Sequence, residues 1–108
     1  HLIDADAIER MKPNAVLVNV SRGPVVDEIA LAEALSRGRI FGAWLDVFER
    51  EPRIAPELLA APNVLMLPHL GSATTEDRSD LTRLSVENVL AVLAGRRPPF
   101  AVDPTPES

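Results

Sequence analysis

The chain has 108 residues, a formal net charge of −5 and no cysteine, and 46% of its residues are hydrophobic. This length indicates one domain or part of one, and the lack of cysteine excludes disulfides, a thiolate nucleophile and a cysteine-ligated zinc site. The acidic balance argues against nucleic acid as a partner, because phosphate binding draws on clustered Lys and Arg. No apolar stretch reaches the ~20 residues that span a bilayer, so we expect no membrane contact.

The first residues resemble the interior of a longer protein. His1-Leu-Ile-Asp4 contains neither an initiator Met nor a signal peptide. Asp4 is a suitable N-cap for a short helix around Ile8, and Pro13 ends that helix because the residue before a proline is pushed out of the helical region. We therefore expect the chain to be a fragment whose domain begins upstream.

Three apolar runs, residues 15–20, 40–48 and 64–67, are predicted to be strands. The first is β-branched and almost continuously apolar, which is typical of a buried parallel strand. Asp27 is the expected N-cap of a helix between the first two runs, and Gly38 is its stop signal. Strands that alternate with helices indicate right-handed βαβ units, so we predict an α/β fold with a parallel sheet.

A polar loop over residues 49–56 and one helical turn over 57–60 precede the third run. After it, Thr74 or Thr75 can cap a long helix that runs to about Ala94. One face of this helix has the apolar spacing of a buried surface, and we expect it in the core, although a partner subunit could cover it instead. That face consists of Val86, Val89, Leu90 and Leu93.

Three polar residues, Arg22, Glu51 and His69, each come shortly after one of the apolar runs. The carboxyl ends of parallel strands meet at one edge, where open α/β sheets bind ligands, so we expect a candidate active site there. A guanidinium can hold a carboxylate through two parallel hydrogen bonds. Histidine exchanges a proton near neutral pH, and a nearby carboxylate orients its ring and favours its protonated form.

Each of these residues also has an ordinary interpretation. Arg22 could pair with an acidic neighbour on the surface, and His69 could be a common surface or core histidine. Glu49 or Asp46 could take the place of Glu51 beside the imidazole. Because His1 is the only other histidine, we expect no metal site.

Three further features have two interpretations each. Gly71-Ser72 could cradle an anion or nucleotide at a helix start, or form a plain capping turn. Asp46 could bond an amide group of a ligand, or end its strand in a turn. Trp44 is expected to pack in the core rather than to stack on a cofactor.

Four segments, in order and with normal spacing, resemble the D-isomer-specific 2-hydroxyacid dehydrogenase family, closest to its glyoxylate/hydroxypyruvate reductase and phosphoglycerate dehydrogenase branches. They are Met11–Gly23, Val26–Glu28, Leu45–Pro52 and Pro68–Thr74. The resemblance implies that residues 1–94 are the C-terminal part of a Rossmann-like, doubly wound NAD(P)-binding domain with three of its strands. Residues 95–108 would then be an extended tail that returns toward a substrate domain.

The resemblance also implies an activity and a setting. It predicts a cytoplasmic, homodimeric oxidoreductase that uses NAD or NADP. The enzyme would interconvert a small 2-oxo acid, such as glyoxylate or hydroxypyruvate, and the D-2-hydroxy acid by hydride transfer. The preference between NADH and NADPH stays open.

Individual residues receive roles from the same resemblance. Arg22 would bind the substrate carboxylate, His69 would be the acid and base, and Glu51 would keep His69 protonated. Asp46 would contact the nicotinamide carboxamide. The residues expected to line the cofactor are Val20, Ser21, Arg22, Asp46, His69, Leu70, Gly71 and Ser72.

The sequence departs from the family pattern in two respects. It contains no G-x-G-x-x-G phosphate fingerprint, and Trp44 stands where the family usually has a small residue. We therefore expect the isolated chain to be inactive and to bind NAD(H) weakly. Two alternatives are an NAD-sensing, corepressor-like binding module and a truncated product without function, although Leu70–Thr74 follows the metabolic-enzyme pattern.

Overall fold

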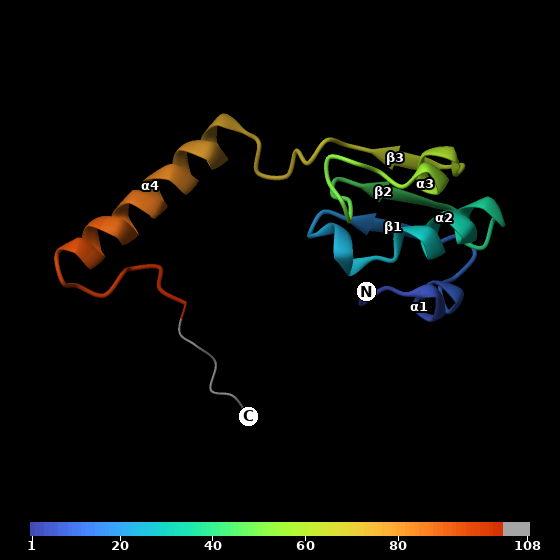
Figure 1. The fold of residues 1–108 in the computed structure, drawn as a ribbon, viewed down its shortest axis with the longest axis horizontal. Helices are drawn as coiled ribbons and strands as arrows, with labels where there is room; N and C mark the ends of the chain where they lie inside the picture. The colour runs from blue at the N-terminus through green and yellow to red at the C-terminus, as the bar shows by residue number, and fades with distance from the viewer. Residues whose placement is uncertain (103–108) are drawn as a thin grey trace, which may run out of the picture. The chain divides into compact units, whose positions relative to one another are not determined.

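Three parallel strands form a sheet in the order β1–β2–β3 (Figure 1). Their bounds are Val16–Asn19 for β1, Gly42–Leu45 for β2 and Val64–Met66 for β3. This computed structural model describes residues 1–102, and the chain divides into two units between Gly71 and Ser72. The sheet belongs to the first unit, and its parallel pairing confirms the strands predicted from the apolar runs.

Three α-helices accompany the sheet in the first unit: α1 (Ala5–Glu9), α2 (Glu28–Ser36) and α3 (Pro56–Ala60), with a 3-10 turn at Gly23–Val25. The side chains of the residues that precede α1 and α2 accept hydrogen bonds from the first turns of these helices, as predicted. These caps are Asp4 to the Ala7 amide and Asp27 to the Ala30 amide, both at 2.9 Å.

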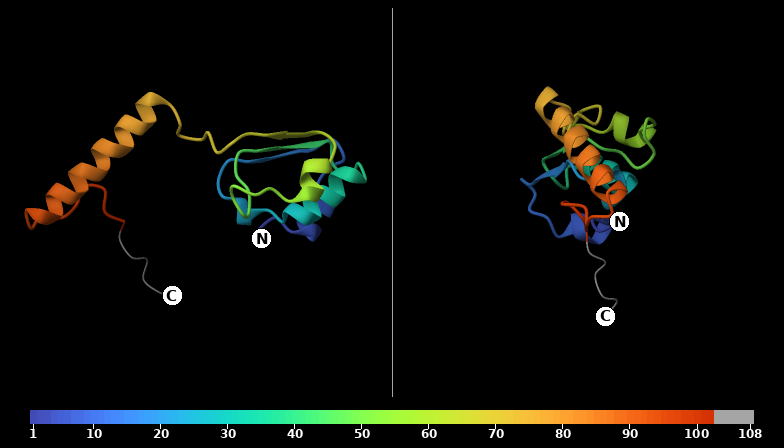
Figure 2. Two further views of the ribbon diagram at one scale, coloured as in Figure 1. Left: turned by 45° about the horizontal axis from the view of Figure 1, so that its top comes forward. Right: turned by 90° about the vertical axis from the view of Figure 1, so that its left-hand side faces the viewer.

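The core lies between the helices and one face of the sheet. Figure 2 shows α1, α2 and α3 on the same side of the strands, as right-handed βαβ connections require when the chain crosses the sheet in one direction. Ile8, Leu31 and Leu58, one from each helix, are the largest fully buried side chains. From the strands, Leu17, Ala43 and Leu45 face the same core.

The opposite face of the sheet is apolar and exposed. Trp44 pairs in register with Val18 on one side and Leu65 on the other, and all three are roughly half exposed. The prediction that Trp44 packs in the core is therefore wrong for this chain, where 56% of the residue is exposed. Side chains alternate along a strand, so Trp44 points away from its buried neighbours, and no helix of residues 1–71 covers that side.

The second unit contains α4 (Thr75–Leu93), whose N-cap Thr74 accepts a hydrogen bond from the Asp77 amide at 3.0 Å. Gly95 follows the helix with φ at +67°, as a helix stop requires. The apolar face predicted to be buried is instead exposed: Val86, Val89, Leu90 and Leu93 are 49–78% accessible. The spacing correctly identified an apolar face, but spacing alone does not say what covers it.

Residues 96–102 form neither helix nor strand, and the rest of the predicted tail, 103–108, lies outside the described residues. The predicted domain boundary after residue 94 stays a prediction. Of the helices in residues 1–102, none combines the length and apolarity that a membrane crossing needs.

Candidate active site

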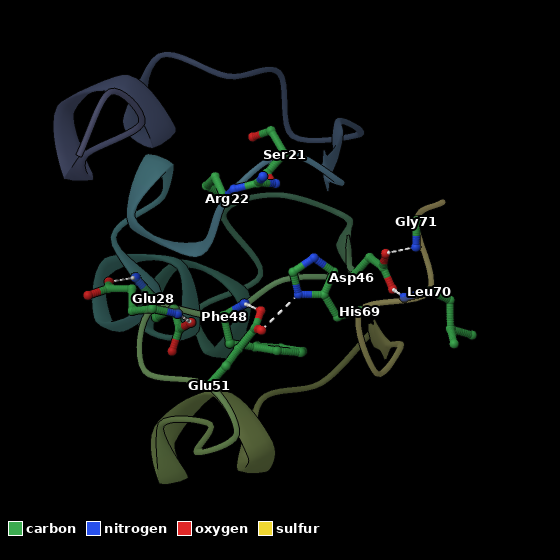
Figure 3. Close-up of polar contacts among 10 residues, drawn as sticks. Ser21, Arg22, Glu28, Asp46, Phe48, Glu51, His69, Leu70 and Gly71 are labelled. Carbon is green, nitrogen blue, oxygen red and sulfur yellow. Dashed lines mark hydrogen bonds and ion pairs between the residues drawn. The ribbon is translucent and has the colours of Figure 1, made fainter. Parts of the chain in front are cut away.

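The predicted site residues come from loops that follow three neighbouring strands. Arg22 follows β1, Glu51 follows β2 and His69 follows β3. Figure 3 shows the His69 ring turned toward the Glu51 carboxylate. Arg22 is bonded to neither; its guanidinium donates to the Ser21 carbonyl oxygen at 2.6 Å. The structure thus joins two of the three residues directly and places the third on the adjoining loop.

Glu51 and His69 form a close pair. The Glu51 Oε2 atom lies 2.8 Å from Nδ1 of His69, and Oε1 of Glu51 accepts a hydrogen bond from the Phe48 amide at 2.9 Å. The bond to His69, and after it the bond from Phe48, lowers the pKa of the Glu51 carboxyl below its ordinary 4.5. Glu51 is therefore a charged acceptor held at both oxygens, which orients the imidazole.

Asp46 holds the turn that carries His69. Its Oδ1 and Oδ2 atoms accept hydrogen bonds from the amides of Leu70 at 2.7 Å and Gly71 at 2.6 Å, and these bonds lower the pKa of the Asp46 carboxyl. His69 itself has φ at +56°, a region that residues other than glycine rarely occupy and that costs about 1–3 kcal/mol. The Asp46 bonds fix this strained turn and so set where the imidazole points.

Asn19 orders the turn that carries Arg22. This residue is only 5% exposed, although it lies at the end of an apolar strand. Its Nδ2 donates to the Arg22 carbonyl oxygen at 3.0 Å, and its Oδ1 accepts from both the amide and the hydroxyl of Ser21. Sequence reasoning missed this role. The available signal was a polar residue inside the run Ala15–Val20.

Gly23 brings the Arg22 turn against the loop of Glu51. A Cβ atom at Gly23 would overlap the carbonyl group of Phe48, so only glycine allows this approach of the two backbones. The loops of Arg22 and Glu51 are consequently packed against each other even though their side chains are not bonded.

These contacts show which neighbours the alternative residues have in the structure. Glu49 does not pair with His69; its carboxylate accepts a hydrogen bond from the Glu28 amide at the start of α2. The Asp46 carboxylate accepts hydrogen bonds from two backbone amides and none from the imidazole. The Gly71 amide is used by Asp46, and α4 is capped by Thr74, so Gly71-Ser72 is not itself the helix cap.

A pocket of about 330 Å³ opens beside the Glu51–His69 pair. This volume lies at the lower end of the range of small-molecule sites, roughly 300–1,000 Å³. Its walls are mainly apolar and are formed by Phe48, Glu51, Pro52, Ile54, Met66, Leu67, Pro68 and His69. A small ligand in this pocket would meet one imidazole–carboxylate pair in otherwise apolar surroundings.

Some of the residues expected to line the cofactor lie in the loops after β1 and β3, and others line a hollow on the sheet. Val20 and Leu70 are exposed at the ends of β1 and β3, and Ser72 begins the second unit. On the open face of the sheet, a hollow of about 100 Å³ is lined by Val18, Val20, Trp44, Leu45, Asp46, Leu65 and Leu67. Apolar walls beside a carboxylate suit a flat ring that carries an amide donor, so these residues fit the nicotinamide end of a dinucleotide.

One group among the described residues has the composition of a metal site: His1, Asp27 and Glu49. Its geometry is that of paired ions. The Nδ1 atom of His1 lies 3.5 Å from Asp27, and Nε2 lies 3.1 Å from Glu49. One ligand atom from each residue also lies within 4.8 Å of the others, an arrangement that exposed acidic groups commonly show without a bound ion.

Comparison with known proteins identifies the family to which this chain belongs. The family model for the D-isomer specific 2-hydroxyacid dehydrogenase, NAD binding domain, matches residues 1–71. The chain belongs to this family, which confirms the family and the Rossmann-like α/β fold expected from the sequence.

Individual members of the family that resemble this chain are named as reductases of small 2-oxo acids. The chain is 50% identical over 105 residues to glyoxylate/hydroxypyruvate reductase B of Pectobacterium carotovorum, covering 96% of the chain and 33% of that protein. It is 48% identical over 103 residues to glyoxylate reductase of Thermococcus litoralis, covering 95% of the chain and 31% of that protein. The chain thus spans about a third of the length of these relatives.

Two solved structures give the same result for the fold. The 2-hydroxyacid dehydrogenase from Ketogulonicigenium vulgare matches with a TM-score of 0.85 and 41% identity, over 95% of this chain and 32% of that one. The NADPH-dependent glyoxylate/hydroxypyruvate reductase of Sinorhizobium meliloti, solved with NADP and malonate, matches with a TM-score of 0.81 and 46% identity, over 85% of this chain and 29% of that one.

Proposed function

We propose that this chain supplies the acid–base site of an NAD(P)-dependent oxidoreductase. The enzyme would interconvert a 2-oxo acid such as glyoxylate or hydroxypyruvate and the D-2-hydroxy acid. The observation that carries the proposal is the 2.8 Å contact between Glu51 and His69 at the wall of an apolar pocket. Family membership and relatives named as glyoxylate or hydroxypyruvate reductases support it.

His69 is the proposed acid and base. Glu51 engages Nδ1, which leaves Nε2 to exchange a proton with the oxygen on the reacting carbon. In reduction, Nε2 gives its proton to the carbonyl oxygen as that carbon gains a hydride, and in oxidation it takes the proton back from the hydroxyl. The Glu51 carboxylate faces Nδ1 at 2.8 Å and holds the ring in place throughout.

Arg22 is the proposed anchor for the substrate carboxylate. Its guanidinium now donates to the carbonyl of Ser21, a weak neutral acceptor beside which a carboxylate would compete well. Asn19 and Gly23 fix the turn that carries Arg22. The backbone of Arg22 is therefore held next to the loop of Glu51.

A bound nicotinamide dinucleotide would supply or accept the hydride. Asp46 is the residue proposed to accept a hydrogen bond from the nicotinamide amide, since it stands at the rim of the apolar hollow on the sheet. Both of its oxygens already accept one backbone N–H, and each carboxylate oxygen has capacity for a further donor. Val20, Ser21, Leu70, Gly71 and Ser72 complete the proposed lining.

Two further features of the enzyme come from the family resemblance. We propose that it is a homodimer and that it works in the cytoplasm on small acid substrates, without nucleic acid or membrane as partner. Light scattering of the complete enzyme would test the dimer, and fractionation of cells that express it would test the location.

A chimeric reductase tests the proposed function. This chain would replace the matching 105 residues of the Pectobacterium reductase, which retains its own remaining two thirds. We expect the chimera to oxidise NADPH or NADH with glyoxylate or hydroxypyruvate, and the isolated chain to show no turnover. A soluble, folded chimera without activity toward either acid would contradict the proposal, and turnover by the isolated chain would contradict its expected inactivity.

A further inference from the structure

Glu28 and Glu49 hold each other's backbone amides, although they lie 21 positions apart. The Oε1 atom of Glu28 accepts a hydrogen bond from the Glu49 amide at 2.5 Å, and Oε1 of Glu49 accepts one from the Glu28 amide at 3.0 Å. Figure 3 shows Glu28 bonded in this way, apart from the pair formed by Glu51 and His69. The proposed proton exchange does not use either bond.

Glu28 is an unusual residue to find buried. Only 6% of it is exposed, and a buried carboxylate is costly unless hydrogen bonds compensate it. Its place at the first position of α2, where the helix dipole is positive, and the bond from the Glu49 amide offset part of that cost. An apolar side chain could fill the same space, so what the carboxylate adds is its hold on Glu49.

The amide that Glu28 holds is next to the one that Glu51 holds. The Phe48 amide donates to Glu51, and the following amide, of Glu49, donates to Glu28. The same stretch of backbone is also in close contact with Gly23. Residues 48–51 are therefore fixed from the α2 side as well as from the active-site side.

We propose that Glu28 is a positioning residue, which fixes the loop from Phe48 to Glu51 through the Glu49 amide and thereby aligns Glu51 with His69. No hydrogen bond joins Glu28 to Glu51 or His69 in the described part of the chain, so its effect passes through the loop backbone. The use of this alignment in catalysis rests on the proposed function. The alignment itself can be measured without any turnover.

Three variants separate positioning from plain stability. Glu28→Leu removes the acceptor and keeps an apolar volume, whereas Glu28→Gln keeps an oxygen that can accept from Glu49. Leu31→Ala is the matched control, because Leu31 is fully buried in the same helix and its apolar side chain makes no hydrogen bond. The control should destabilise the chain by leaving a cavity without releasing the loop.

The first readout is an NMR pH titration of the Glu51 carboxyl carbon in this chain. Glu28→Leu should raise the pKa of Glu51 toward its ordinary value, because a released loop weakens the bonds from His69 and Phe48 that lower it. Glu28→Gln and Leu31→Ala should leave it low. If Glu28→Leu fails to fold, Glu28→Ser decides in its place, since water can satisfy the Glu49 amide there without fixing the loop.

The second readout is kinetic and uses the chimeric reductase. There, Glu28→Leu should lower kcat by up to about 100-fold with little change in KM, because misplacing a catalytic group by an ångström has effects of that size. Glu28→Gln should restore the rate. An inactive parent chimera would contradict the proposed function alone. A Glu51 pKa that stays low in the folded Glu28→Leu or Glu28→Ser chain, or that rises equally in Leu31→Ala, would overturn the positioning role.

Discussion

At the scale of single residues, the candidate site depends on carboxylates that other groups of the protein hold in place. Glu51 is bonded at both oxygens, to His69 and to the Phe48 amide. Asp46 is likewise bonded at both oxygens, to the amides that follow His69. Preorganised charges of this kind need no rearrangement at the moment of reaction, which is why they are effective in catalysis.

The carboxylate anchor can be tested through the Michaelis constant. In the chimera, Arg22→Ala should raise KM for glyoxylate by roughly 10- to 100-fold, because a hydrogen bond between charged groups contributes about 1.5–3 kcal/mol. Arg22→Lys should recover only part of the loss, since an ammonium cannot make two parallel bonds. Steady-state kinetics at saturating cofactor measures both, and an unchanged KM in Arg22→Ala would remove the assigned role.

The pair of Glu51 and His69 also predicts a pH dependence of stability. The pKa of Glu51 is lowered in the folded chain by the bond from His69. A carboxyl of this kind stabilises the fold above its unfolded pKa of 4.5, and the contribution disappears as the pH falls through the lower folded value. The difference in unfolding free energy between the chain and Glu51→Gln should therefore shrink below pH 4.5.

Urea unfolding at pH values on both sides of that point checks this dependence. Glu57→Gln is the matched control, because Glu57 is an exposed carboxylate of the same unit with no hydrogen bond to the described residues. A difference for Glu51→Gln that stays constant across the range, or that grows toward acid, would show that the bond to His69 is not formed in solution.

At the scale of elements, the site depends on how closely the loops approach each other. Gly23 tests this most sharply. Gly23→Ala should destabilise the chain by about 3 kcal/mol or more, because its Cβ would overlap backbone that cannot swing aside. Gly38→Ala is the control: that glycine has open space around it and φ at +65°, so the change should cost only about 1 kcal/mol. Equal losses would contradict the packing of the two loops.

The helices and the parallel strands could be predicted from the sequence, whereas the side-chain contacts between distant segments could not. Asp4, Asp27 and Thr74 are caps in the structure because capping depends on the residue itself and the few that follow it. The hydrogen bond between Glu28 and Glu49 joins segments 21 residues apart, and no local sequence pattern predicts it. The left-handed turn at His69 could not be predicted either, because histidine is enriched in that region but only a small share of histidines adopt it.

At the scale of the whole molecule, two apolar faces of the described residues are exposed to solvent. One is the sheet face that carries Trp44, and the other is the face of α4 that carries Val89 and Leu90. Contiguous exposed apolar surface of this kind is uncommon on soluble monomers. Apolar periodicity reports which side chains avoid water but not which element covers them, so both faces were wrongly predicted to be core.

The open sheet face gives a stability prediction. Trp44→Ala should change the unfolding free energy of the isolated chain by less than about 1 kcal/mol, as for exposed positions in general. Leu31→Ala, at a fully buried position, should cost about 2–5 kcal/mol. Urea denaturation at low protein concentration measures both, and a cost for Trp44→Ala that matched Leu31→Ala would mean that the indole is buried after all.

The most direct test of the central claim, that His69 is the proton donor of a 2-oxo acid reductase, is the kcat of the chimera with His69→Ala. We predict a loss of about 100- to 10,000-fold, the range for a missing general acid, with the KM for the acid changed little. The assignment would be contradicted by a kcat equal to that of the parent chimera.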